Sequence, residues 1–146
     1  MAIVLLLRRA SIADLELLGS LNHQLIEDEG HRNALTLSQL RERMRGWITV
    51  EYTAMLFECK GEVVGYALYR DEPGLVYLRQ FFVRSDRRRK SMGRKAFDLL
   101  RQQIWPAGKR ITVEVLIANT AAVAFWKAVG FKDYAVTLEI PSAAAP

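Results

Sequence analysis

The sequence predicts an α/β domain in which helices cover both faces of a mixed, mainly antiparallel central sheet. Two helical segments, each opened by a capping pattern, come early in the chain, and three strand-like runs joined by turn residues follow them. A strand-helix-strand crossover, which makes two strands parallel, lies in the second half. The predicted order is β-α-α-β-β-β-α-β-α-β, and 146 residues suit a single domain of ordinary size.

Both early helices are predicted from their first turns. Ser11 with Asp14 three positions later has the pattern of a capping box, so the first helix is expected to begin there and to end near Gly30. Thr36 with Gln39 repeats the pattern before a second segment with a 3.6-residue apolar period. Two amphipathic helices are therefore expected between the first strand and the three strand-like runs that follow.

Strands are expected where short runs rich in β-branched and aromatic residues lie between turn signals. In the first part of the chain these runs are residues 3–7, 54–58, 63–69 and 75–83. After them we expect a helix that Pro106 ends, a strand at 111–117, a helix at 121–129 closed by Gly130, and a last strand at 131–140. The domain then spans residues 1–141, and 142–146 are expected to be a flexible tail.

Composition excludes several classes of protein. Cys59 is the single cysteine, which excludes an internal disulfide framework and a multi-cysteine metal site, and we expect a reducing cytoplasm and no metal. The apolar N-terminus ends at Leu7 and is followed by two arginines, so we interpret it as a strand rather than a signal peptide. No later stretch is long enough for a membrane span, and no membrane partner is expected.

The positive charge is concentrated in one loop. Residues 84–95 hold seven basic residues and one acid, Asp86, and so carry +6, whereas the rest of the chain sums to −1. A charge confined to one loop and the first turn of a helix favours a compact polyanion over a long nucleic-acid track. We therefore expect no nucleic-acid partner.

The same loop has the local chemistry of a phosphate site. It joins a strand to a helix whose first backbone N–H groups point back into the loop, and it offers Gly93 for close approach and the Ser91 hydroxyl as a donor. It lacks the Gly-Lys-Ser/Thr ending of a Walker loop and the three spaced glycines of a dinucleotide fingerprint. Another phosphate-bearing ligand is required.

Two motifs in the right order suggest that ligand. The loop reads Arg88-x-x-Ser91-x-Gly93, and about 30 residues downstream the chain reads Asn119-x-x-Ala122-x-x-Phe125-Trp126-x-x-x-Gly130-Phe131. With the element order, these motifs resemble those of the GNAT family of N-acetyltransferases. The resemblance implies a GNAT-like fold and acetyl-CoA as acyl-donor co-substrate. It also implies direct transfer of the acetyl group to a primary amine, on a small molecule or a peptide, within a ternary complex.

The resemblance also implies a set of coenzyme-binding residues. The backbone at the end of the strand 75–83 would pair with the pantetheine arm, and the basic loop would hold the pyrophosphate. The expected residues are Phe82, Val83, Arg88, Arg89, Lys90, Ser91, Met92, Gly93, Arg94, Asn119 and Trp126. An N-cap role for Asn119, a buried structural role for Cys59 and a core role for Phe125 are expected beside these.

Departures from the family pattern affect the chemistry. Ser91 replaces a glycine, and Trp126 replaces the tyrosine that is the usual candidate for protonating the leaving thiolate. We expect either no dedicated acid, because a thiolate is a tolerable leaving group, or Tyr134 or Tyr69 in that role.

The general base must also come from an unusual place, because Arg79-Gln80 stands where many relatives have acids. We expect it from the acidic segment 27–33, as Glu29 or His31, with Glu114 as a second candidate.

Other functions remain open at this point. A non-catalytic acyl-CoA-binding or regulatory domain fits the missing tyrosine, and a different acyl group or a hydroxyl acceptor fits the same loop. Only 16 residues follow Gly130, and ten of them make up the single strand expected there, so the sheet is expected to expose an edge that a second subunit of a homodimer would cover.

Overall fold

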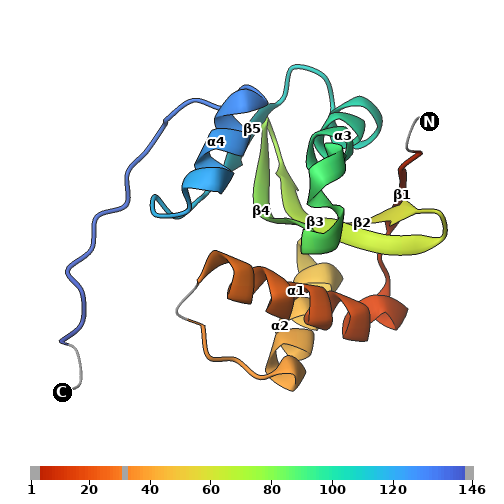
Figure 1. Ribbon diagram of the computed structural model, residues 1–146, viewed down its shortest axis with the longest axis horizontal. Helices are drawn as coiled ribbons and strands as arrows, with labels where there is room; N and C mark the ends of the chain where they lie inside the picture. The colour runs from red at the N-terminus through yellow and green to blue at the C-terminus, as the bar shows by residue number, and fades with distance from the viewer. Residues whose placement is uncertain (1–3, 31–32, 144–146) are drawn as a thin grey trace.

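A computed structural model describes residues 4–30 and 33–143, apart from the side chains of 88–90 (Figure 1). Among them five strands form one sheet in the order β1-β2-β3-β4-β5. The strands are β1 (Leu6–Arg9), β2 (Tyr52–Cys59), β3 (Glu62–Glu72), β4 (Leu75–Val83) and β5 (Arg110–Val113). Three neighbouring pairs are antiparallel and β4 with β5 is parallel. The mixed, mainly antiparallel sheet is confirmed.

Helices lie on both faces of this sheet, as expected (Figure 1). The helices are α1 (Leu15–Glu29), α2 (Leu37–Val50), α3 (Met92–Leu99), which continues as a π-helical turn at Leu100–Ile104, and α4 (Thr120–Ala128). One apolar core lies under α1 and α2, and a second, which includes the buried thiol Cys59, lies under α3 and α4.

Both predicted capping boxes are present. Ser11 Oγ accepts from Ala13 N–H, and Asp14 Oδ2 accepts from Ser11 N–H at 2.8 Å. The box at α2 is equally complete, since Thr36 and Gln39 exchange backbone-to-side-chain bonds of 2.9 and 3.2 Å. A short 3₁₀ turn separates Ser11 from α1, and α1 ends at a left-handed Gly30 as expected.

A bulge in β4 changes which side chains face each core. Leu78 pairs with Tyr69 of β3, but Leu68 pairs with Gln80, so Arg79 is an extra residue. Even-numbered Leu78 faces the core under α3 before the bulge, whereas odd-numbered Phe81 faces it afterwards. Beyond the bulge β4 no longer pairs with β5, whose partners are residues 75–78 only. The two parallel strands therefore diverge.

The last expected strand, at 131–140, is not formed. Residues 131–143 contain no regular secondary structure and run away from the sheet (Figure 1). Tyr134, Val136, Leu138 and Ile140 alternate along this segment and are 79–97% exposed. Alternation alone is insufficient because a strand needs a neighbour for its hydrogen bonds, and β5 ends at Val113 instead of reaching 117. The first strand also begins later than expected, at Leu6, and residues 144–146 of the expected tail lie outside the described part.

Candidate active site

A cavity of about 780 Å³ opens where β4 and β5 diverge. It extends from the first turn of α3 and the start of α4, past the end of β4, to the last turn of α1 and the middle of α2. Parts of two predicted regions, the basic loop with the first turn of α3 and the acidic segment, therefore line one cavity. From the predicted site its lining includes Glu29, Phe82, Val83, Ser91, Gly93, Arg94, Glu114, Asn119 and Trp126.

The loop before α3 forces Ser91 into an unusual conformation. After the 3₁₀ turn Ser85–Lys90, Ser91 has φ 56° and ψ 27°, in the left-handed region. A non-glycine residue there costs about 1–2 kcal/mol. The first intrahelical bond of α3 runs from Lys95 N–H to the Ser91 carbonyl at 3.1 Å. The backbone N–H groups of the first turn come before this bond and have no intrahelical acceptor. The strained residue stands where the family pattern has glycine.

Gly93 lies against an aromatic ring as well as against the cavity. A Cβ at Gly93 would meet Phe125 Cε1 at 3.3 Å and Phe81 Cε1 at 3.8 Å. The neighbouring Met92 side chain is only 1% exposed and packs in the core, so Met92 faces the cavity at most through its backbone. A small residue at 93 thus keeps the first turn of α3 close to the aromatic cluster.

Part of the loop's charge is used within the fold. Arg84 Nη1 and Arg87 Nη2 donate to the two oxygens of Glu62, at 2.6 and 2.7 Å, and Arg84 also pairs with Asp86. These two arginines tie the loop to β3. The side chains of Arg88, Arg89 and Lys90 lie outside the described residues.

The second motif places Asn119 and Trp126 at the cavity. Asn119 Oδ1 accepts from Ala122 N–H at 3.2 Å, which confirms its role as the N-cap of α4. Trp126 is 7% exposed and packs edge-to-face with Phe81, Phe125 and Phe131 at 4.9–5.2 Å between ring centres. The indole is therefore part of the core under α4 while it lines the cavity.

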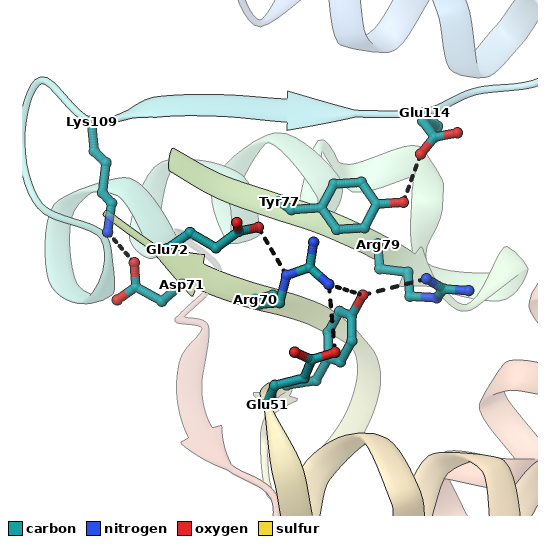
Figure 2. Close-up of polar contacts among 9 residues, drawn as sticks. Glu51, Arg70, Asp71, Glu72, Tyr77, Arg79, Lys109 and Glu114 are labelled. Carbon is teal, nitrogen blue, oxygen red and sulfur yellow. Dashed lines mark hydrogen bonds and ion pairs between the residues drawn. The ribbon is translucent and has the colours of Figure 1, made fainter. Parts of the chain in front are cut away.

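At the strand divergence Tyr77 and Glu114 form a pair. The Tyr77 hydroxyl donates to Glu114 Oε1 at 2.7 Å (Figure 2). Burial, and after it the hydrogen bond and charge of Glu114, raise the pKa of Tyr77 to about 12. Tyr77 is thus a neutral phenol that orients a carboxylate beside the opening.

The comparisons with known proteins agree with this geometry. Residues 18–131 match the acetyltransferase (GNAT) family. The chain belongs to the GNAT family. No curated protein sequence matches the chain significantly.

Solved GNAT structures share the fold of this domain at low sequence identity. A possible acetyltransferase from Clostridium difficile 630 is 13% identical with a TM-score of 0.77, covering 97% of this chain and 99% of its own. An aminoglycoside N-acetyltransferase, AAC(6')-Iy, in complex with CoA is 14% identical with a TM-score of 0.74, covering 99% and 98%. A predicted acetyltransferase from Clostridium acetobutylicum with acetyl-CoA is 16% identical with a TM-score of 0.70, covering 94% and 96%.

Both tyrosines that we considered as acids lie away from the cavity of this GNAT domain. Tyr134 is 79% exposed on the segment after α4, where the Arg110 guanidinium carbon lies 4.5 Å from its ring centre. Tyr69 is buried in the core under α3 with its ring against Trp105. The missing last strand explains the position of Tyr134, because that strand would have held it against the sheet. Neither lines the cavity.

The acidic segment reaches the GNAT cavity in part. Asp28 and Glu29 in the last turn of α1 and Asn33 beyond it line the cavity. His31 lies outside the described residues. Within those residues no group of three or more His, Cys, Asp or Glu is placed to hold a metal ion, and no helix there has the length and apolarity needed to cross a membrane.

Sequence reasoning gave no site role to several residues of this GNAT cavity, among them Asn22, Arg43, Trp47, Tyr77 and Arg79. Asn22 interrupts the apolar stripe of α1 and is fully buried, so a polar residue inside that stripe was the available signal. Arg79 carried no local signal, because a bulge is set by strand pairing and not by residue type.

Proposed function

We propose that this GNAT domain transfers an acetyl group from acetyl-CoA to a primary amine. The observation that carries the proposal is that one cavity joins the loop of α3, the end of β4 and the Glu114 carboxylate. A donor bound along the first two would present its acyl group at the third. The AAC(6')-Iy structure with a bisubstrate analogue of CoA and acetylneamine supports direct transfer, since in that protein one ligand joins both halves.

The residues present fit acetyl-CoA. The left-handed Ser91 and the side-chain-free Gly93 bring the backbone of the α3 first turn to the cavity, where N–H groups and the helix dipole favour a pyrophosphate. Phe82 and Val83 lie where β4 has left β5, beside the expected path of the pantetheine arm. Arg94 lines the same end and adds positive charge, and Arg88, Arg89 and Lys90 belong to the same loop. Acetyl-CoA supplies an activated thioester carbonyl.

Glu114 is the proposed general base for the acceptor amine. The amine nitrogen forms a bond to the acyl carbon, the carbon–sulfur bond breaks with its electron pair on sulfur, and the proton of the amine passes to the carboxylate or to water. Glu114 lines the cavity, and Tyr77 holds it in place by donating to one of its two oxygens. Glu29, at the far end, attracts a cationic acceptor, and His31 belongs to the same segment.

A dedicated acid is unnecessary in this arrangement. Tyr77, with a pKa raised to about 12, is a weaker acid than a thiol, whose pKa is about 8.5. Tyr77 therefore keeps its proton while the thiolate leaves unprotonated at neutral pH. The indole of Trp126 has no acidic proton to offer.

Two substitutions distinguish the proposed general base, Glu114, from the proposed acceptor-binding residue, Glu29. We expect Glu114→Gln to lower kcat by about a hundredfold or more in a thiol-release assay over an amine panel. Glu29→Gln is expected to raise the acceptor KM instead. Glu42→Gln is the control, because Glu42 lies on the exposed surface of α2 and pairs with Arg45. Calorimetry should give unchanged acetyl-CoA affinity in all three.

A non-catalytic acyl-CoA-binding domain is the second candidate, favoured by Trp126 in place of the usual tyrosine. It predicts acetyl-CoA binding without thiol release for every amine or alcohol in the panel. Thiol release with an alcohol or with a longer acyl donor, and none with amines and acetyl-CoA, would instead redefine the acceptor or the acyl group.

The segment 131–140 leads us to propose a homodimer. Its exposed apolar alternation suits pairing with an edge strand, and β5 is at the edge of the described sheet. A molar mass of one chain in light scattering at micromolar concentration would contradict this. A reducing cytoplasm is the compartment we propose, since Cys59 is a buried free thiol.

A further inference from the structure

Two arginines of the cavity lack an acidic partner within the described part of the chain. Arg43 of α2 donates from Nη2 to Asn22 Oδ1 at 3.0 Å, and Arg79 of β4 donates from Nη1 to the Tyr52 hydroxyl at 3.3 Å. Neither forms an ion pair with a carboxylate among the residues that the structure describes. Arg70 shows the contrast, since it pairs with Glu72 at 2.8 Å and with Glu51 (Figure 2). Arg43 and Arg79 therefore line the cavity without an ion pair to any described carboxylate, although Asp28, Glu29 and Glu114 line it elsewhere.

Aromatic rings hold the two guanidinium groups near each other. The Arg43 and Arg79 guanidinium carbons lie 4.5 and 4.7 Å from the centre of the Trp47 ring, and Arg79 also lies 5.8 Å from that of Tyr52. Burial, and after it the charge of Arg79, lower the pKa of Arg43 from its usual value. The fold therefore tolerates two like charges beside one ring, and an anion bound near them would relieve their repulsion.

A buried amide adds a third donor at the same place. Asn22 is fully buried and lines the cavity, and its Nδ2 makes no hydrogen bond within the described residues. The neighbouring Tyr66 hydroxyl interacts with Asn22 and donates its own proton to Gln80 Oε1 at 2.7 Å. A buried amide whose N–H groups lack well-formed hydrogen bonds is destabilising, so an acceptor atom from a ligand would be favourable here.

We infer that the amine acceptor also carries a carboxylate, which Arg43, Arg79 and Asn22 bind. The inference rests on the proposed acetyl transfer. Arg79 and Tyr77 are two residues apart on β4, a spacing of roughly 7 Å along a strand, and Tyr77 holds Glu114 (Figure 2). The carboxylate and the reacting amine are therefore separated by a short distance. The substrate class is a free amino acid or a similarly short amino carboxylate.

Positive groups of an acceptor are disfavoured beside these two arginines. A cationic group placed against Arg43 or Arg79 would face a like charge, which opposes binding. Asp28 and Glu29 line the α1 end, so an amino acid with a basic side chain would find its partner there. Every substrate of this class nevertheless needs the carboxylate that Arg43, Arg79 and Asn22 bind.

The test compares amino acids with their own carboxamides. Initial rates of acetyl transfer are measured for L-amino acids and the matching amides with the wild type, Arg43→Gln and Arg79→Gln. The ratio of kcat/KM for acid over amide is compared between proteins, because intrinsic amine reactivity then cancels. We expect each variant to lower this ratio by about ten- to a hundredfold, mainly through the KM of the acid. Arg45→Gln, on the exposed face of α2, should leave it unchanged.

A binding measurement keeps the outcomes separate. Calorimetric titration of the wild type, saturated with CoA, should show an amino acid binding at least tenfold more tightly than its amide, even if a variant fails to fold or no turnover occurs. If simple amines are acetylated and the ratio of kcat/KM for acid over amide is the same in all proteins, the carboxylate inference is overturned and the proposed function stands. Carboxylate-dependent binding without acetylation of any amine would support the carboxylate site and overturn the transferase. Preference for an amine that carries a phosphate over every amino acid would overturn the assignment to carboxylates.

Discussion

A methyl group added at Gly65 tests whether the approach of β3 to the end of β4 shapes the coenzyme site. A Cβ there would lie 2.1 Å from the Phe82 carbonyl oxygen and 3.0 Å from Val83 Cα. Both are backbone atoms, so the clash is relieved only if one strand moves by about 1 Å; overpacking of this kind costs about 1–3 kcal/mol. For a chain of this length that lowers Tm by about 4–10 °C.

The same movement displaces the part of β4 that would pair with pantetheine. We therefore expect Gly65→Ala to weaken acetyl-CoA binding by about tenfold in calorimetry, well below its Tm. Gly46→Ala is the matched control, because a Cβ at this exposed position of α2 meets nothing within 4 Å. That variant should raise stability by about 0.5–1 kcal/mol through better helix propensity and keep full affinity. Wild-type Tm and affinity for Gly65→Ala would refute the reasoning.

Three further predictions concern the loop and the strand divergence. Gly93→Asp should lower acetyl-CoA affinity by tenfold or more, because a carboxylate would repel the pyrophosphate; unchanged calorimetric affinity would place the phosphates elsewhere. Ser91→Gly should raise the free energy of unfolding by about 0.5–1 kcal/mol by relieving the left-handed φ, whereas Ser91→Val should lower it, and the reverse order in urea titrations would contradict the strained geometry. Tyr77, whose pKa is raised from 10.0 to about 12, stabilises the fold fully below pH 10 and loses this effect as pH rises through 12. After allowance for solvent screening this amounts to about 1 kcal/mol, so Tyr77→Phe should flatten the loss of stability between pH 9 and 11.5 by that amount. Identical pH profiles would argue against the raised pKa of Tyr77, which burial and then Glu114 cause.

Local sequence signals determined much of the fold. The capping boxes at Ser11 and Thr36 and the left-handed Gly30 were predictable because capping depends on residues three or four positions apart. The loop before α3 and the Asn119 cap were also predictable, since a strand, a loop and a helix in sequence bring N–H groups to one edge. The family followed from the spacing of these motifs.

Pairing between distant segments decided the rest. The bulge at Arg79, the divergence of β4 from β5 and the absence of a strand at 131–140 depend on register and on neighbours, which residue type does not encode. The cavity likewise joins Asn22, Arg43 and Arg79 from three elements. Each looks like an ordinary polar residue in its own segment, and only tertiary packing places them around one space without a carboxylate partner among the described residues. The loop before α3 was therefore predictable from the sequence, whereas the part of the cavity at Asn22, Arg43 and Arg79 was decided by the tertiary structure.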